Sequence, residues 1–244
     1  MATLGFLETD TLYPELLPDY GSYGRMFARF FGRLDADLRY RYYQARQGEL
    51  PLHPDECDAF LITGSRAGVY DRLPWIGPLR SWIMDFHERG AKIIGICFGH
   101  QIIAHSLGGH AGKSPKGWGL GLHSTAIKST LFECFSENCR WSEHDEAPQQ
   151  LRLLYSHQDQ VERLPACAEL LAGSDFCPYA AFRIDRRIMS FQGHPEFTPA
   201  YLQRLLQRRI EVIGREKYEQ AIASLTLEND ASAVGTLLLD FIYS

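Results

Sequence analysis

A short apolar run that ends in Gly-Ile-Cys-Phe-Gly constrains the fold of this chain more than any other feature. Residues 93–96 are isoleucine or glycine, which predicts a buried parallel strand. Apolar residues at helical spacing over 101–107 predict a helix that follows almost at once, and Gly95 and Gly99 permit the sharp turn between the two elements. A side chain at this turn, here Cys97, is expected to project above a sheet towards the first N–H groups of the helix. Enzymes of the α/β class place nucleophiles at such joints.

The remaining pattern predicts an α/β fold. Strands are expected at residues 3–7, 38–45, 59–63 and 92–96, and helices at 23–33 and 75–89. This order predicts a doubly wound, mostly parallel sheet with helices on both faces, as in flavodoxin-like proteins. Short antiparallel strands are expected at 123–129, 151–154, 169–172, 180–184 and 188–192, and further helices from Pro199 and over 232–242. Residues 1–244 contain no repeat or linker and are expected to form one domain.

Cys97 has two readings. Free cysteines are commonly small buried hydrophobes, but a thiol next to helix N–H groups can also act as a thiolate nucleophile. A nucleophile needs a base and a group that orients the base, and residues 188–197 provide both types at the end of another apolar strand. There His194 and Glu196 are separated by Pro195, whose fixed φ stiffens their spacing. The competing interpretation of His194 and Glu196 is a partly exposed polar strand end.

These motifs resemble the class I glutamine amidotransferases, whose glutaminase domains carry a G-x-C-x-G-x-Q turn and a late H-P-E. The segment Thr63-Gly64-Ser65 is similar to the glycine loop of the family, and residues 155–161 are similar to its S-H-x-D-x-V segment. The resemblance extends from about residue 4 to residue 197. Within the family it is greatest to the glutaminase domain of GMP synthase and to free-standing relatives that include γ-glutamyl peptidases. It implies a catalytic triad of Cys97, His194 and Glu196.

The resemblance also suggests how a substrate would bind. The N–H of Phe98 and one N–H of the Gly64–Ser65 loop are expected to donate hydrogen bonds to an oxyanion. Gln101 is implied at the amino-acid end of the substrate. Ser156 and His157, with Asp159, match a segment that in relatives borders the substrate or a partner domain. Where the family has consecutive glycines, Gly64 is followed here by Ser65 and Arg66, which leaves the conformation of this loop open.

The function implied is hydrolysis of a γ-glutamyl amide through a Cys97 thioester, without a cofactor. Neither a P-loop nor an ATP-pyrophosphatase loop occurs in the chain. Two enzymatic readings follow: a glutaminase subunit that supplies ammonia to a separate synthetase, and a free-standing γ-glutamyl peptidase or hydrolase of small conjugates. A third interpretation is a non-catalytic cysteine sensor of related fold. Members of that group usually place a histidine directly after the cysteine and lack H-P-E. Here Phe98 follows Cys97 and His194-Pro195-Glu196 is complete, so this interpretation is disfavoured.

The net charge and the hydropathy of the chain restrict the kinds of partner that are expected. The net charge is −5 and the 25 basic residues are dispersed, which argues against nucleic acid. Arg204, Arg208 and Arg209 form the densest basic group and are expected on a solvated helix face. No run reaches membrane-spanning length and no leader-like segment is present, so a cytoplasmic protein is expected. Residues 8–22, which include Tyr13 and Tyr20, are expected either to border the pocket as a specificity lid or to form a simple surface loop.

The cysteines give no sign of a metal. The six cysteines contain no C-x-x-C pair, and they are expected to be reduced thiols. Cys134, Cys139 and His144 are poorly spaced for zinc, so no metal site is expected there.

Overall fold

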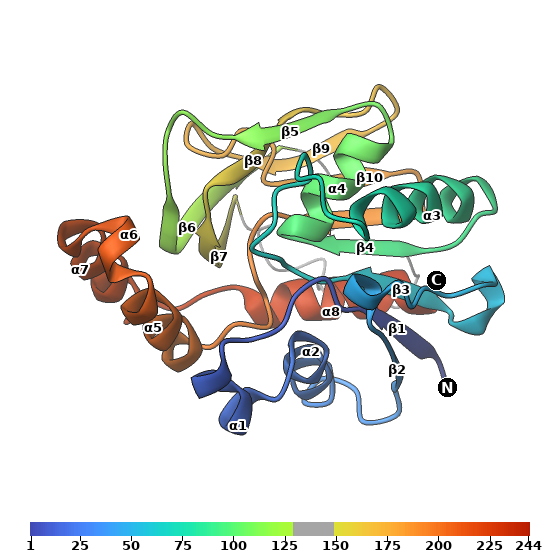
Figure 1. Cartoon of the computed structure of the whole chain (residues 1–244), viewed down its shortest axis with the longest axis horizontal. Coiled ribbons are helices and arrows are strands. Elements are labelled where there is room, and N and C mark those ends of the chain that lie inside the picture. The colour runs from blue at the N-terminus through green and yellow to red at the C-terminus, as the bar shows by residue number, and fades with distance from the viewer. Residues whose placement is uncertain (129–148) are drawn as a thin grey trace.

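A nine-stranded sheet forms the centre of the molecule in the computed structural model, which describes residues 1–128 and 149–244 (Figure 1). The strand order is β2-β1-β3-β4-β11-β10-β9-β6-β7. The strands are β1 (Thr3–Leu7), β2 (Arg39–Tyr43), β3 (Ala59–Ile62), β4 (Ile93–Ile96), β6 (Gly119–Ile127), β7 (Gln150–His157), β9 (Glu169–Gly173), β10 (Ala181–Ile184) and β11 (Ile188–Phe191). A separate antiparallel pair joins β5 (His110–Lys113) to β8 (Asp159–Arg163).

The sheet is parallel in one half and antiparallel in the other. Strands β2, β1, β3, β4 and β11 run parallel, whereas β11, β10, β9, β6 and β7 pair with their neighbours in antiparallel fashion. The parallel strands β3, β4 and β11 are buried throughout, as their apolar runs predict. The predicted α/β fold, with a parallel sheet extended by short antiparallel strands, is therefore confirmed.

Helices cover both faces of the parallel strands (Figure 1). On one face pack α3 (Ile76–Glu88) and α4 (Phe98–Ser106), whose apolar side chains join one core cluster with Phe60 and Ile62. On the other face pack α2 (Tyr23–Phe31) and the C-terminal α8 (Ala231–Tyr243), in a second cluster with Leu4 and Phe6. Two buried cores separated by one sheet are the arrangement that the alternating pattern predicts.

A third apolar cluster lies at the antiparallel end. It joins the segment after β1 to α5 (Pro199–Arg208), α6 (Ile210–Ile213) and α7 (Arg215–Ser224). The segment after β1 contains the short helix α1 (Leu17–Tyr20) and the 3-10 turn Pro14–Leu16; two more 3-10 turns lie at Ala45–Gln47 and Pro54–Glu56. The segments 8–22 and 199–224, remote in sequence, thus meet beside the carboxyl ends of the strands.

The predicted elements differ from the observed ones in identifiable ways. Helix α4 begins at Phe98, three residues before the expected apolar run, and β6 and β7 are both longer than expected. Residue 129, the end of one expected strand, lies outside the described residues. Strands β5 and β8 and helix α7 were not predicted, because their sequences HAGK, DQVER and REKYEQAIAS lack an apolar run. Within the two described ranges, no helix combines the length and apolarity needed to cross a bilayer.

Candidate active site

Cys97 occupies a strained turn between β4 and α4. Its φ of 55° and ψ of −102° are unusual for a residue other than glycine, and such strain is common at functional sites. The turn is fixed on both sides, since the Cys97 N–H donates to Phe191 O at 2.9 Å and its carbonyl accepts from the Gln101 N–H at 3.0 Å. A Cβ at Gly99 would lie 2.2 Å from Ile62 O. The glycine after Cys97 is therefore required by the close approach of helix and strand.

His194 and Glu196 form a buried pair in the segment after β11. The His194 N–H donates to Leu154 O at 2.9 Å, and His194 Nδ1 lies 2.8 Å from Glu196 Oε1. Both residues are buried, at 3% and 4% exposure. The imidazole also stacks on Phe197, with ring centroids 3.8 Å apart and planes inclined by 6°. A hydrogen bond along one edge and an aromatic ring on one face hold the imidazole in a single orientation.

Gly64 lies between His194 and Cys97. A Cβ on Gly64 would stand 2.9 Å from His194 Cε1 and 3.6 Å from Cys97 Cβ, so this position has no room for a side chain. Burial by itself would lower the pKa of His194, but the charges of Glu196 and Cys97 and hydrogen bonds to both raise that pKa to about 10. The arrangement can therefore hold a proton on His194 at neutral pH.

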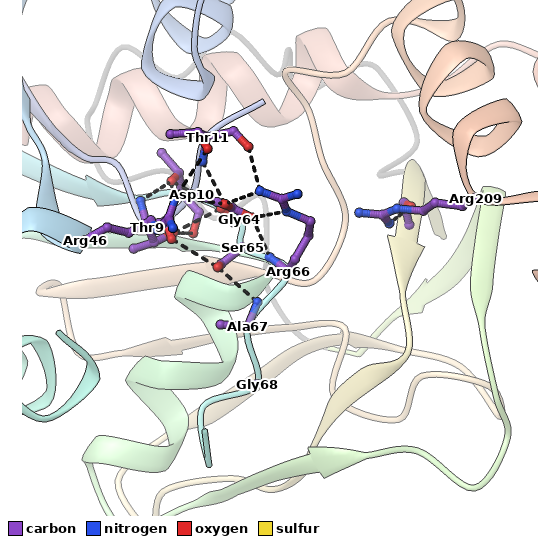
Figure 2. Close-up of polar contacts among 12 residues, drawn as sticks. Thr9, Asp10, Thr11, Arg46, Gly64, Ser65, Arg66, Ala67, Gly68 and Arg209 are labelled. Atoms are coloured by element: carbon purple, nitrogen blue, oxygen red, sulfur yellow. Dashed lines mark hydrogen bonds and ion pairs between the residues drawn. The ribbon is translucent and has the colours of Figure 1, made fainter. Parts of the chain in front are cut away.

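The loop that carries Gly64 is braced by the segment after β1 (Figure 2). Ser65 Oγ donates to Thr9 O at 3.1 Å and accepts from the Ala67 N–H at 3.1 Å. Arg66 donates to Asp10 from its backbone N, its Nε and its Nη2, at 2.9, 2.8 and 2.8 Å. The conformation left open by the sequence Gly64-Ser65-Arg66 is thus defined by side-chain contacts in place of a second glycine.

Asp10 is a residue that the sequence analysis did not single out. It is buried, at 6% exposure. Burial acts to raise the pKa of the Asp10 carboxyl, but hydrogen bonds from Arg66 and the Arg66 charge outweigh it and hold that pKa below its usual value. Its ion pair with Arg66 spans 56 residues of sequence, and no local motif marks such a partnership.

Gln101 and His157 are tied together through Asp159. Gln101 Nε2 donates to Asp159 O at 2.7 Å and to Gln192 Oε1 at 3.0 Å. His157 Nδ1 lies 3.0 Å from the same Asp159 carbonyl. Burial lowers the pKa of His157 to about 3, so the ring is neutral and Nδ1 is the donor. Phe98 opens α4, so its N–H has no acceptor inside the helix.

A cavity of about 390 Å³ opens beside Cys97, within the size range of about 300–1,000 Å³ typical of small-molecule sites. Six of the residues proposed from sequence line it: Ser65, Cys97, Gln101, Ser156, His157 and Asp159. The other lining residues are Tyr13, Arg66, Ala67, Gly68, Tyr70, Asp71, Lys113, Trp118, Gln158, Arg209 and Val212. His194, which lies next to Gly64, and Glu196 are both buried, and neither is among the residues that line this cavity.

The loop at 8–22 contributes one wall of this cavity through Tyr13. Tyr20 does not line it and instead packs edge-on against Tyr201, with centroids 4.9 Å apart. Of the three arginines expected on a solvated face, Arg204 and Arg208 do lie there, paired with Asp19 and Glu15. The expectation was wrong for Arg209, which lines the cavity and donates to Ser156 Oγ at 2.9 Å. Arg209 follows the last residue of α5 and therefore leaves the face that Arg204 and Arg208 share.

Metal ligands are not gathered in the described part of the chain. No group of three or more His, Cys, Asp or Glu side chains in residues 1–128 and 149–244 could hold a metal ion. Cys134, Cys139 and His144 lie outside the described residues.

Comparison with known proteins identifies relatives in sequence and in structure. The family model described as glutamine amidotransferase class-I matches residues 16–212. γ-Glutamyl peptidase 3 of Arabidopsis thaliana is 32% identical over 207 residues, which cover 84% of this chain and 79% of that protein. GMP synthase of Aromatoleum aromaticum is 28% identical over 180 residues, 69% of this chain and 33% of that protein. The crystal structure of a glutamine amidotransferase from Thermotoga maritima superposes with a TM-score of 0.75 at 18% identity, covering 99% and 98% of the two chains.

Proposed function

Because this chain belongs to the class I glutamine amidotransferase family, we propose that it hydrolyses a γ-glutamyl amide bond through a thioester on Cys97. The observation that carries the proposal is the arrangement around Gly64. A cysteine on a strained strand–helix turn, a histidine in contact with the same glycine and a glutamate 2.8 Å from that histidine are the nucleophile, the proton carrier and the orienting group that amide cleavage needs.

In the proposed first half-reaction, the Cys97 thiolate attacks the carbonyl carbon of the γ-glutamyl amide. Negative charge moves to the carbonyl oxygen, to which the N–H of Phe98 and one N–H of the Gly64–Ser65 loop would donate hydrogen bonds. As the C–N bond breaks, the His194 imidazolium transfers its proton to the leaving nitrogen. An amine or ammonia departs, and a γ-glutamyl thioester remains on Cys97.

The second half-reaction uses water. His194 is now neutral and accepts a proton from a water molecule, whose oxygen attacks the thioester carbonyl. The C–S bond breaks, glutamate leaves, and the thiolate and imidazolium are restored. Glu196 keeps the imidazole oriented through both halves and stabilises its positive charge, so that no step requires a cofactor.

Two physiological settings are compatible with this chemistry. The relative named γ-glutamyl peptidase supports a hydrolase that acts alone on small γ-glutamyl compounds. The relative named GMP synthase supports a glutaminase that delivers ammonia to a synthetase. The first setting predicts that the purified chain is active alone, and the second that activity on glutamine rises when a synthetase is added.

The test of the shared chemistry is release of glutamate from glutamine and from a γ-glutamyl dipeptide by the purified protein. Cys97→Ser is expected to lower turnover at least a thousandfold, whereas Cys167→Ser, which changes an exposed cysteine, is expected to leave it unchanged. Mass spectrometry after brief treatment with a γ-glutamyl electrophile should find the label on Cys97. Wild-type turnover in Cys97→Ser would refute the assignment.

A further inference from the structure

Arg209 places a guanidinium on the wall of the cavity. Its Nη1 donates to Ser156 Oγ at 2.9 Å, and its guanidinium carbon lies 5.8 Å from the centroid of the Trp118 ring. Arg204 and Arg208, on the same helical segment, are paired with Asp19 and Glu15. Among residues 1–128 and 149–244 no carboxylate forms an ion pair with Arg209. A half-buried guanidinium held against a ring and a hydroxyl has donors available for an anionic ligand.

A second arginine, Arg66, lines the same cavity and contacts the Tyr13 hydroxyl that Arg209 also contacts. The single negative charge of Asp10 is shared between Arg66 and Arg46. Figure 2 shows the two arginines on different elements, with the Arg209 side chain extending towards the Arg66 side and the Arg66 guanidinium turned towards Asp10 and Thr11. Tyr13 stands between them, and the Arg66 guanidinium lies over its ring at 4.7 Å. We call Tyr13, Arg66 and Arg209 the cationic rim.

The field of this rim is visible at Tyr13. Burial acts to raise the pKa of the Tyr13 hydroxyl, but the charges of Arg209 and Arg66 and hydrogen bonds from both outweigh it and lower that pKa. An environment that stabilises a phenolate also stabilises a carboxylate at the same place.

A second group of lining residues has mixed charge. It consists of Asp71, Asp159 and Lys113, and Gln101 donates to the backbone carbonyl of Asp159. Acidic and basic groups side by side match the α-ammonium and α-carboxylate of a free amino-acid end. Cys97 lines the same cavity as both groups. A glutamyl group whose amino-acid end lies by Asp159 leaves the cationic rim free for its leaving group.

The position of His194 also indicates where the leaving group would lie. His194 must meet the leaving nitrogen in order to protonate it. Its imidazole stacks on Phe197, which belongs to the apolar cluster that Leu12 and Tyr13 join from the loop after β1. The leaving group is therefore expected on the side of Tyr13.

We propose that Arg209, with Tyr13 and Arg66, binds a carboxylate carried by the leaving group, so that the substrate is a γ-glutamyl peptide with a free carboxyl terminus. Glutamine, whose leaving group is ammonia, cannot use this contact. The inference rests on the proposed γ-glutamyl hydrolase function and defines its substrate class. Each added residue extends the leaving group by about 3.3–3.6 Å, so the reach of Arg209 selects a peptide length.

The test compares acids with their amides. The probes are γ-glutamylglycine, γ-glutamylalanylglycine, the C-terminal amide of each, and glutamine, with kcat/KM measured from glutamate release. Wild type is expected to prefer the acid over the amide by about 10- to 100-fold at one of the two lengths, the size of a charge-assisted hydrogen bond. Arg209→Gln should bring this ratio close to one by slowing the acid, while kcat/KM for the amide changes less than about threefold.

Three further variants separate recognition from structure. Arg209→Lys keeps the charge and should retain part of the acid preference. Arg204→Gln removes an arginine of the same segment that is paired with Asp19 outside the cavity, and should leave the ratio unchanged. Ser156→Ala removes the hydroxyl that Arg209 contacts and tests whether Arg209 only positions β7. The melting temperature of each variant controls for folding.

Distinct results would overturn the proposal. No acid preference in wild type at either length would refute it, as would equal losses on acid, amide and glutamine in Arg209→Gln, which would assign Arg209 to the glutamyl end or to packing. If wild type turned over none of the probes, the hydrolase function would fail instead. The carboxylate contact would then be decided by calorimetric binding of each acid and amide to Cys97→Ala, in which an acid preference abolished by Arg209→Gln supports it and equal affinities refute it.

Discussion

Replacement of Gly64 by alanine tests the geometry of the site with a single methyl group. The added Cβ would stand 2.9 Å from His194 Cε1, whereas non-bonded carbons pack at about 3.5–4.0 Å. The imidazole cannot easily retreat, because Glu196 holds one edge at 2.8 Å and Phe197 lies against its face. Relief of the contact therefore requires a shift of about half an ångström or more in the ring or the loop.

The size of the effect follows from this shift. A misplacement of about 1 Å costs about 100-fold in rate at a preorganised site, so we expect kcat to fall by about 10- to 100-fold. Overpacking of a buried position costs about 1–3 kcal/mol of unfolding free energy. The assays are glutamate release under saturating substrate and urea denaturation of the same preparation.

Gly77→Ala is the matched control. It adds the same methyl group within α3, where no atom lies within 4 Å of the added Cβ. This variant should retain full activity and gain up to about 1 kcal/mol, since alanine is the better helix former. Wild-type kcat and unchanged stability in Gly64→Ala would refute the placement of His194 beside Gly64.

Three further predictions concern charged groups in and around the site. His194 has its pKa raised to about 10, so its proton is present below that pH, and kcat/KM should fall as the pH rises towards 10. Glu196→Gln removes the negative charge that contributes most to the raised pKa of His194. The pH–rate profile of this variant should therefore show its alkaline limb at lower pH and a reduced maximum. An alkaline limb at the wild-type pH would contradict the role of Glu196. Asp10→Asn weakens three hydrogen bonds from Arg66, whose side chain is 39% exposed. The free energy of unfolding, measured by urea denaturation, should fall by about 1–2 kcal/mol. An unchanged denaturation midpoint would contradict this prediction.

Features set by neighbouring residues could be predicted from the sequence. The parallel strands and the helices that cover them follow from local apolar periodicity, because the side chains that must be buried recur at the spacing of each element. The turn at Cys97 is marked by two glycines, and a Cβ at Gly95 would lie 2.7 Å from the backbone of Gly99, a clash between residues only four apart in sequence. His194 and Glu196 stand two residues apart, so their pairing was also accessible.

Other features depended on contacts between remote segments. Asp10 and Arg66 are 56 residues apart, and a charged side chain carries no periodic signal that names its partner. Strands β5 and β8 are short and mostly polar. Each adds one apolar residue, Ala111 or Val161, to the core cluster beside α4, and one apolar residue is too few for a recognisable strand pattern. The same holds for Arg209: its spacing from Arg204 and Arg208 indicated a solvated face, and only the end of α5 at Arg208 turns it towards Ser156 and the cavity. The strand–helix frame and the strand-end positions of Cys97, His194 and Glu196 could be predicted, because local sterics and hydrophobicity encode them. The charged walls around them could not, because they form only when segments 8–22, 64–71 and 199–212 meet.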